Sequence, residues 1–296
     1  MAKKAKPEIA IIGAGVVGTA IGVLAARAGY TVTAVASRHN ASANRAAKLI
    51  GPPAEACSPQ EAIGRGQIVL ITVPDDSIAA VAAHLAETGT LQPKAVIVHC
   101  SGALDSTILS PLAQRHGAAV ASMHPLQTFP TVQIALSSLA GCYCFCEGDH
   151  RAMSRVMQLA ADIGCVPVEI EADRKALYHA SACIACNYLA TLQEAAIAAA
   201  VLAGIGRVPA RRALAPLVAA TVNNINTLGP QKALTGPIAR GDSQTVLRHI
   251  TALRATDTQL ADLYCQLGLR TVTLALQAGK ISPGQANRLR EVLSTR

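Results

Sequence analysis

The sequence has few aromatic residues and no cluster of like charges. It has no Trp, two Phe and five Tyr among 296 residues, which leaves little to stack on nucleic-acid bases. Lys and Arg outnumber Asp and Glu by 26 to 18 but never form a run of more than two residues. The sequence therefore predicts no nucleic-acid partner, and an anionic small molecule explains the basic excess equally well.

Long hydrophobic runs are also absent, although the chain is 51% hydrophobic with a mean hydropathy of +0.34. The longest near-continuous apolar run, 195–205, is shorter than the ~20 residues that a bilayer crossing needs. The apolar stretch at 9–17 is followed by no cleavage-site pattern and is typical of a first strand rather than of a signal peptide. We expect a cytoplasmic protein with no membrane span.

Nine cysteines are present, but their spacing favours neither disulfides nor a metal site. Cys142, Cys144 and Cys146 alternate, so in a strand they share one face and are expected to be buried. Cys183 and Cys186 lie in a helical pattern with no second pair at metal-ligand spacing. The sequence therefore predicts buried thiols and no metal.

The first half of the chain alternates short β-branched runs with Ala-rich helical stretches. Near-continuously apolar strands indicate a parallel sheet covered on both faces, and the alternation indicates right-handed crossovers. The predicted fold class is α/β: a doubly wound parallel Rossmann sheet at 1–171, followed by an all-α C-terminal domain at 172–296. Predicted strands are 9–12, 31–36, 68–73, 95–99, 118–123, 142–146 and 166–170, and later helices are 173–204, 209–228, 242–267 and 283–293.

A glycine pattern after the first predicted strand is typical of dinucleotide binding. Residues 13–18 read Gly-x-Gly-x-x-Gly between a strand and a helix, which is the context that makes the motif specific. The glycines permit a tight turn, a close approach to pyrophosphate and close packing of helix on strand, while the helix start attracts phosphate. The predicted cofactor-binding residues here are Gly13, Ala14, Gly15, Val16, Val17 and Gly18.

The end of the second predicted strand lacks the acidic residue typical of NAD sites. An Asp or Glu about 20 residues after the glycines usually binds the ribose of NAD, but this sequence has Ser37 and Arg38 there. A hydroxyl and a guanidinium suit a 2′-phosphate, so we predict NADP (NADPH) as the cofactor; the alternative is that Arg38 is a solvated loop residue. Val73 and Pro74 should line the same crevice.

Polar motifs follow two later strands, at the edge of the sheet where ligands bind. Ser101 and Gly102 could hold a substrate carboxylate or carbonyl through a hydroxyl and backbone amides. His124 could exchange a proton with the reacting atom, since the unperturbed pKa of histidine lies near neutrality. His99 is expected to orient its loop instead.

The helical half supplies further candidates. Lys175 and His179 are four residues apart and share one helical face. The residues after them are small or apolar, so either side chain could be a desolvated proton donor; the alternative is an ordinary solvated face. Asn187 and Arg240 could position substrate, with Arg240 either clamping a carboxylate or pairing with Asp242.

Taken together, these motifs resemble a bacterial family, the Rossmann-like proteins with a C-terminal DUF2520 domain. The resemblance implies kinship with F420-dependent NADP reductases, pyrroline-5-carboxylate reductases and ketopantoate reductases. It also implies a 6-phosphogluconate dehydrogenase-like helical domain that pairs subunits into a homodimer. The wider β-hydroxyacid dehydrogenase superfamily implies a Lys near the nicotinamide and an Asn four residues later; Lys175 matches, but position 179 is His. The resemblance rests on GAGVVG at 13–18, HCSGAL at 99–104, MHPLQTFP at 123–130, KALYHASACIACNYL at 175–189 and ALTGPIARGD at 233–242.

These features predict an enzyme, an oxidoreductase that transfers hydride between NADPH and a small, anionic keto or imino substrate. Ketopantoate reduction is the most concrete example. Two alternatives stay open. One is a dinucleotide-binding sensor or assembly protein without turnover, because a fold does not prove chemistry. The other is a metal-dependent site formed by His99, Cys100 and His124.

Overall fold

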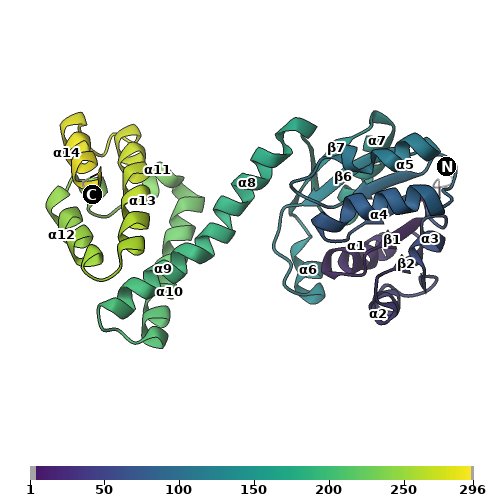
Figure 1. The fold of residues 1–296 in the computed structure, drawn as a ribbon, viewed down its shortest axis with the longest axis horizontal. Coiled ribbons are helices and arrows are strands. Elements are labelled where there is room, and N and C mark those ends of the chain that lie inside the picture. Colours follow the sequence, from purple (N-terminus) through teal and green to yellow (C-terminus); the bar gives the residue numbers. More distant parts are fainter. Residues whose placement is uncertain (1–4, 295–296) are drawn as a thin grey trace. The chain divides into compact units, whose positions relative to one another are not determined.

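The computed structural model describes residues 5–294, which form two compact units, the first ending at Ile184 and the second beginning at Ala185. The first unit is an α/β sandwich and the second is helical (Figure 1). The division comes later than the expected boundary near residue 171. The reason is that the helix beginning at Lys175 contacts the sheet, as described below.

The first unit contains one eight-stranded sheet in the order β3-β2-β1-β4-β5-β6-β7-β8. All neighbouring strands are parallel except β6 and β7, which are antiparallel. The predicted doubly wound fold is therefore confirmed, with two differences: the sheet is not parallel throughout, because β7 runs antiparallel to β6, and it has an additional three-residue strand, β3. The strands are β1 Ile9–Ile12, β2 Val32–Ala36, β3 Glu55–Cys57, β4 Ile68–Ile71, β5 Val96–His99, β6 Ala119–Pro125, β7 Tyr143–Gly148 and β8 Val166–Glu169.

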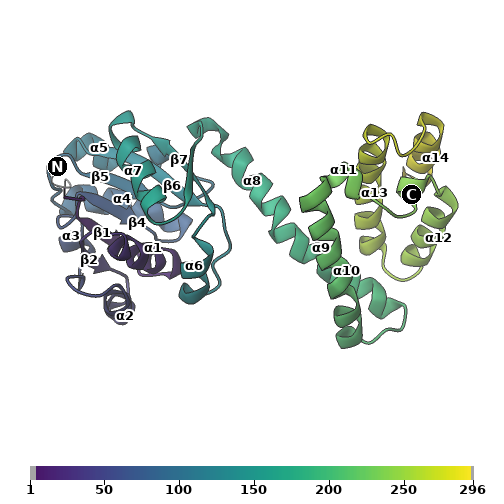
Figure 2. The same cartoon turned by 180° about the vertical axis from the view of Figure 1, so that it is seen from behind.

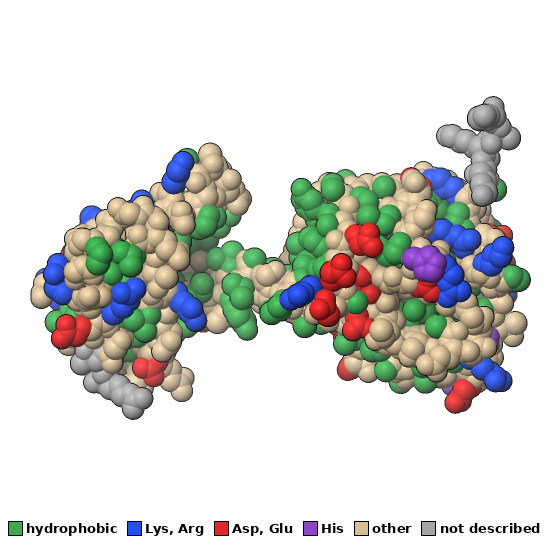
Figure 3. Space-filling model, turned by 90° about the horizontal axis from the view of Figure 1, so that it is seen from above, with side chains coloured by type: hydrophobic (Ala, Val, Ile, Leu, Met, Phe, Trp, Pro, Cys, Tyr) green, Lys and Arg blue, Asp and Glu red, His purple; other side chains and the backbone are tan. Residues whose placement is uncertain are grey.

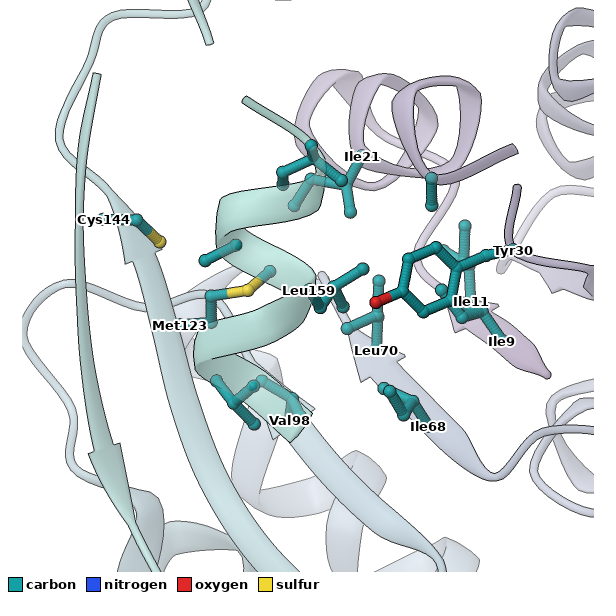
Figure 4. Close-up of a cluster of buried hydrophobic side chains, with 14 of the residues drawn as sticks. Ile9, Ile11, Ile21, Tyr30, Ile68, Leu70, Val98, Met123, Cys144 and Leu159 are labelled. Atoms are coloured by element: carbon teal, nitrogen blue, oxygen red, sulfur yellow. The ribbon is translucent and has the colours of Figure 1, made fainter. Parts of the chain in front are cut away.

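Helices cover both faces of the sheet, which explains why the central strands are apolar throughout. Figure 2 shows α1 and α6 together on one face, and α4 and α5 cover the other. In Figure 4, Ile21 of α1 and Leu159 of α7 lie over strand residues such as Leu70. The helices are α1 Val16–Arg27, α2 Asn40–Ile50, α3 Pro59–Ala62, α4 Asp75–Thr88, α5 Ser110–His116, α6 Val132–Ser138, α7 His150–Asp162 and α8 Lys175–Ala185, with short 3₁₀ turns η1 Ser106–Leu109 and η2 Ala172–Arg174.

The second unit has its own core, formed mainly by its last three long helices. Two predicted helices are divided in the structure. The stretch at 173–204 is interrupted at Cys186, and the stretch at 242–267 is interrupted because Asp257 accepts a hydrogen bond from Leu260 N and begins a new helix. The elements are α9 Asn187–Leu202, α10 Arg207–Leu228, α11 Pro230–Ala233, η3 Ile238–Arg240, α12 Ser243–Arg254, α13 Thr258–Gln277 and α14 Pro283–Ser294.

One helical stretch, Ala172–Leu202, is long and apolar enough to cross a membrane when judged by length and composition alone. Only 6% of its most apolar window is buried. Hydrophobic side chains are visible at the surface of this stretch (Figure 3). A helix that packs against another protein surface has the same length and composition. In addition, the first turn of the stretch 172–202 carries a buried lysine, Lys175.

The cysteines in β7 and directly before it are buried, as predicted. Cys142, Cys144 and Cys146 are at most 8% exposed, and Cys142 Sγ lies 3.6 Å from Cys165 Sγ. Within residues 5–294, no three His, Cys, Asp or Glu side chains are grouped so that they could hold a metal ion.

Candidate active site

A cavity of about 580 Å³ opens at the carboxyl ends of β1, β2 and β4. This edge, where the strand order reverses beside β1, is where ligands bind in doubly wound sheets. Five of the eight cofactor residues predicted at the glycine corner and the β4 end line it, and so do both residues predicted at the end of β2. The lining includes Gly13, Ala14, Gly15, Ser37, Arg38, His39, Ser42, Pro59, Thr72, Val73, Pro74, Ser77 and His84.

The glycine corner is fixed by a residue that the sequence analysis did not single out, Thr72. Its hydroxyl donates a hydrogen bond to Gly13 O at 2.6 Å, and a Cβ on Gly13 would lie 2.5 Å from the Thr72 carbonyl carbon. Gly13 also has a φ of +121°, which L side chains rarely adopt. Gly15 differs, since a Cβ there would meet nothing within 4 Å. Its missing side chain leaves space for a ligand rather than for the protein.

The electrostatics of the cavity suit a phosphorylated ligand. The N-terminus of α1 has no side-chain cap at Gly15, and neither α1 nor α2 has an acidic residue in its first turn. The N–H groups at both helix starts can therefore receive phosphate. The exposed Arg38 lies at the start of α2. These residues fit a dinucleotide with a phosphate on its adenosine ribose.

A hydrogen bond joins the edge of this cavity to the next loop. Asp75 follows Pro74 at the start of α4, and its Oδ2 accepts a hydrogen bond of 2.6 Å from Ser101 Oγ. Ser101 Oγ also accepts from the backbone N–H groups of Ala103 and Leu104. The Ser101 hydroxyl is thus already bonded on both sides, and its observed contacts shape the 101–104 turn.

That turn brings Gly102 against two histidines. A Cβ on Gly102 would lie 2.6 Å from His179 Cδ2 and 2.8 Å from His124 Nε2. The two imidazole rings have centroids 6.0 Å apart. The structure therefore brings together three residues predicted from separate motifs, and only glycine leaves room for both rings.

His124 has a partner that the sequence analysis missed, Tyr178. The Tyr178 hydroxyl lies 2.7 Å from His124 Nδ1, and its ring packs on Phe145 with centroids 4.4 Å apart. With the hydroxyl as donor, the neutral imidazole carries its proton on Nε2, which lies on the side of the ring that faces Gly102. Burial, followed by the charge of Lys175, lowers the pKa of His124 to about 4, so the ring is neutral at pH 7.

His99 orients its loop, as expected. It is fully buried, and its Nδ1 accepts from Ser101 N while its Nε2 lies 3.1 Å from Asp105 O. Burial is the main cause that lowers its pKa to about 4, so the neutral ring uses both nitrogens within the protein. The metal-dependent alternative needs a free nitrogen on this ring, and the observed contacts leave none.

Lys175 is buried rather than solvated, with 2% of its surface exposed. Its Nζ donates to Ser101 O at 2.9 Å and to Ser122 Oγ, and lies 3.5 Å from Glu147 Oε1. It therefore contacts the same turn as the histidines, through Ser101 O.

Two predicted substrate-binding residues belong to the second unit. Asn187 begins α9, and Arg240 ends the short turn before α12 and is exposed. Asp242 caps α12 through Thr245 N, and no ion pair joins it to Arg240 in the part of the chain that the structure describes. The histidine cluster of the first unit is built without either residue.

Solved structures share this architecture. A protein of Thermotoga maritima is 25% identical, with a TM-score of 0.74 and 92% of this chain and 100% of that chain covered. A reductive aminase of Aspergillus terreus, described in complex with NADPH4, cyclohexanone and allyl amine, is 17% identical (TM-score 0.64; 97% and 99% covered). An imine reductase of Myxococcus stipitatus, described in complex with NADP+, is 17% identical (TM-score 0.62; 96% and 99% covered).

Family models match the two halves of the chain separately. A Rossmann-like domain matches residues 1–125, and a domain of unknown function, DUF2520, matches residues 142–271. No curated protein matches the sequence. The chain therefore joins a Rossmann-like domain to a DUF2520 domain.

Proposed function

We propose that the chain is an NADPH-dependent oxidoreductase that reduces a small carbonyl or imine compound. The observation that carries this proposal is the Asp75–Ser101 hydrogen bond of 2.6 Å. It joins a cavity that fits a phosphorylated dinucleotide to the turn on which His124 and His179 meet. The aminase and imine reductase of the same fold, described with NADPH4 and NADP+, support the choice of cofactor.

The proposed chemistry divides between cofactor and protein. When bound, NADPH supplies a hydride to the carbon of a C=O or C=N bond. His124 Nε2–H then donates its proton to the oxygen or nitrogen, and Nδ1 takes up the proton of the Tyr178 hydroxyl. Solvent returns a proton to Tyr178, which is partly exposed. His179 lies across Gly102 and would position the reacting atom.

The substrate class is a finer proposal. A carboxylate on the substrate, as in ketopantoate, would be bound by Arg240, whose guanidinium is exposed. The reductive aminase of the same fold is described with a neutral ketone and an amine, which favours a wider range of carbonyl compounds. Both classes therefore belong in the first experiment.

The experiment is to mix the purified protein with NADPH and follow loss of the reduced cofactor. The panel should hold ketopantoate, a cyclic imine carboxylate, and a neutral ketone with and without an amine. Oxidation of NADPH by at least one compound is expected. Tight NADPH binding without turnover on any of them would instead favour a sensor or assembly protein.

Substitution of Arg38 tests the preference for NADPH. Arg38→Ala should raise the Kd for NADPH by about 10- to 100-fold, because a charge-assisted hydrogen bond to phosphate contributes about 1.5–3 kcal/mol. The Kd for NADH should change by less than about 2-fold, since NADH has no such phosphate. Fluorescence titration measures both values. Arg27→Ala, an exposed arginine at the far end of α1, is the control; an equal loss for NADH and NADPH would contradict the assignment.

We also propose that the second unit pairs two copies of the chain. Along the whole of α9 only Ile197 is buried, and along α10 only Ala210 is buried. Leu217 and Leu228 are 62% and 51% exposed. Exposed apolar surface of this extent is typical of protein–protein interfaces, and a twofold pair buries the same face of both copies.

Leu217→Glu should therefore weaken self-association at least about 10-fold, because a buried unpaired charge costs well over 1.4 kcal/mol. Sedimentation velocity over a concentration series measures the effect. Leu49→Glu is the matched control, since Leu49 is 60% exposed on α2 of the first unit. A monomeric wild-type protein at all concentrations would contradict the proposed pairing.

A further inference from the structure

The buried ammonium of Lys175 is fully occupied by protein oxygens. Its three N–H groups face Ser101 O, Ser122 Oγ and Glu147 Oε1. Glu147 is 3% exposed, and its two oxygens also accept hydrogen bonds of 2.9 and 2.8 Å from Ser106 N and Ser106 Oγ. A charge pair at this depth is stable only when its remaining hydrogen bonds are made, and here they are.

This pair lies in one of two layers that attach α8 to the sheet. The polar layer consists of Ser122 on β6, its register partner Glu147 on β7, and Lys175. The ring layer consists of His124 on β6, its register partner Phe145 on β7, and Tyr178.

The spacing of these layers follows from regular geometry. Residues two apart on a strand share a face and lie about 6.6 Å apart. Residues three apart on a helix have Cβ atoms about 5–6 Å apart on neighbouring positions. Contact in the polar layer therefore sets the register in which Tyr178 meets His124.

We propose that Lys175 is a positioning residue: by holding the first turn of α8 in the polar layer, it places Tyr178 against His124 and His179 against Gly102. This inference rests on the proposed function only for the reaction that the placement serves. The ammonium also touches the turn directly through Ser101 O, one residue before Gly102. The buried ammonium of Lys175 therefore contacts the turn that carries Gly102 and belongs to the helix that carries Tyr178 and His179.

The same contacts argue against Lys175 as the proton donor. A donor must reach the substrate, but each N–H of this ammonium faces a protein oxygen and 2% of the residue is exposed. Burial lowers the pKa of Lys175, but loss of its proton would leave the carboxylate of Glu147 buried beside a neutral amine, which is costly. His124 Nε2, in contrast, has no protein partner among the hydrogen bonds of the described residues and lies at Gly102.

The charge of Lys175 also acts on His124. After burial it is the largest cause that lowers the pKa of His124 to about 4, and it lowers the pKa of His99 in the same direction. Removal of this charge therefore raises the pKa of His124 toward the ordinary value of 6.5. The titratable and charged groups around His124 are Asp75 of α4, His99 of β5, Glu147 of β7, and Lys175, Tyr178 and His179 of α8.

The test is a pH titration of histidine ring signals by NMR in full-length protein with ¹⁵N-labelled histidine. Lys175→Met should raise the pKa of His124 by at least about one unit, since removing a nearby charge produces shifts of this size. It should also broaden or shift the Nδ1 signal, because the Tyr178 contact loosens. Lys48→Met, at an exposed lysine on α2, is the matched control and should leave the titration of His124 unchanged.

Two further variants keep the test decisive if Lys175→Met fails to fold. Lys175→Met combined with Glu147→Gln removes both charges, so no unpaired carboxylate stays buried. Ser122→Ala removes one acceptor of the ammonium and leaves the charge pair. The double variant should raise the pKa of His124, and both should shift its Nδ1 signal. If the signals and pKa of His124 match the wild type in both variants, the positioning role is wrong.

Turnover separates a positioning residue from a proton donor. In Lys175→Met and in the double variant, the displaced histidine cluster should lower kcat roughly 100-fold, because misplacement of a reacting group by about 1 Å has an effect of this size. The Kd for NADPH should stay within about 2-fold of wild type. The pH profile should keep both limbs. Loss of one limb in the double variant, with His124 still titrating normally, would identify Lys175 as the donor and overturn the proposal. The NMR result needs no substrate, so it decides the placement even if no compound is reduced.

Discussion

Replacement of Gly15 by aspartate is expected to abolish NADPH binding while leaving the fold slightly more stable. Gly15 is the N-cap of α1, with an extended backbone (φ −81°, ψ −169°) that aspartate can adopt, and a Cβ there meets nothing within 4 Å. Asp is a preferred N-cap and its charge favours a helix N-terminus. The unfolding free energy of the ligand-free protein should therefore rise by up to about 1 kcal/mol.

The same carboxylate opposes the cofactor. It would occupy the space that Gly15 leaves for a pyrophosphate and would repel it by roughly 4 kcal/mol for unit charges about 4 Å apart. This corresponds to a Kd raised by more than about 100-fold. Gly15→Ala, which adds a methyl group without charge, should give a smaller loss and separates steric from electrostatic effects.

Fluorescence titration with NADPH and thermal unfolding without it measure the two opposite changes. Gly284→Ala is the control, because a Cβ at Gly284 has Arg288 Nη1 as its nearest neighbour at 3.8 Å, in the second unit. If Gly15→Asp binds NADPH as the wild type does, the dinucleotide does not lie on this corner, and the oxidoreductase proposal fails with it.

Replacement of His124 by phenylalanine should lower kcat by about 10²- to 10⁴-fold, the usual contribution of a positioned acid or base. Phenylalanine keeps a ring in the ring layer but has no nitrogen to donate at Gly102. NADPH affinity should stay within about 2-fold of wild type, because none of the cavity-lining residues changes. Steady-state kinetics on a compound that oxidises NADPH measure the effect.

Tyr178→Phe removes only the hydroxyl 2.7 Å from His124 Nδ1. We expect a loss of about 10-fold in kcat, the size of one hydrogen bond, and little change in KM. His150→Gln is the control, since the side chain of His150 is 92% exposed and lies at the start of α7.

For His124→Phe, a fall in kcat of less than about 3-fold would remove His124 from the chemistry and leave His179 as the remaining candidate.

The cofactor corner could be predicted because it is a local feature. A strand, a glycine turn and a helix follow one another within residues 9–27. The residues of this short segment therefore indicate the geometry of the corner before any contact with distant parts of the chain is known. Ser37 and Arg38 could be placed by the same reasoning, since they come directly after β2. Thr72 was missed because it follows β4, which is distant in sequence from the Gly13 that its hydroxyl contacts.

The histidine cluster could be predicted only in part. His124 and His179 were identified by residue type, but their approach at Gly102 depends on contacts between β6, the 101–104 turn and α8. Tyr178 carried a weak signal, being three residues after Lys175 on the same predicted helix. Nothing in the sequence pairs Tyr178 with His124, because a hydrogen bond between two distant segments leaves no repeating pattern of residues in the sequence.

The role of Lys175 shows the same limit. Its i, i+4 relation to His179 is a property of the helix and was visible in the sequence. Its burial was not, since Glu147 and Ser122 lie on antiparallel strands whose register only the folded sheet sets. The position of the domain division at Ile184, rather than near 171, follows from the same contacts.

By itself, the sequence determined the doubly wound sheet, the glycine corner and the helical second half, because each depends on residues close together in the chain. The tertiary structure decided which polar side chains meet at Gly102 and which are buried among protein partners. The physical reason is that a buried charge or ring is placed by the partners that satisfy it, and here those partners are contributed by the 101–104 turn, β6, β7 and α8 together.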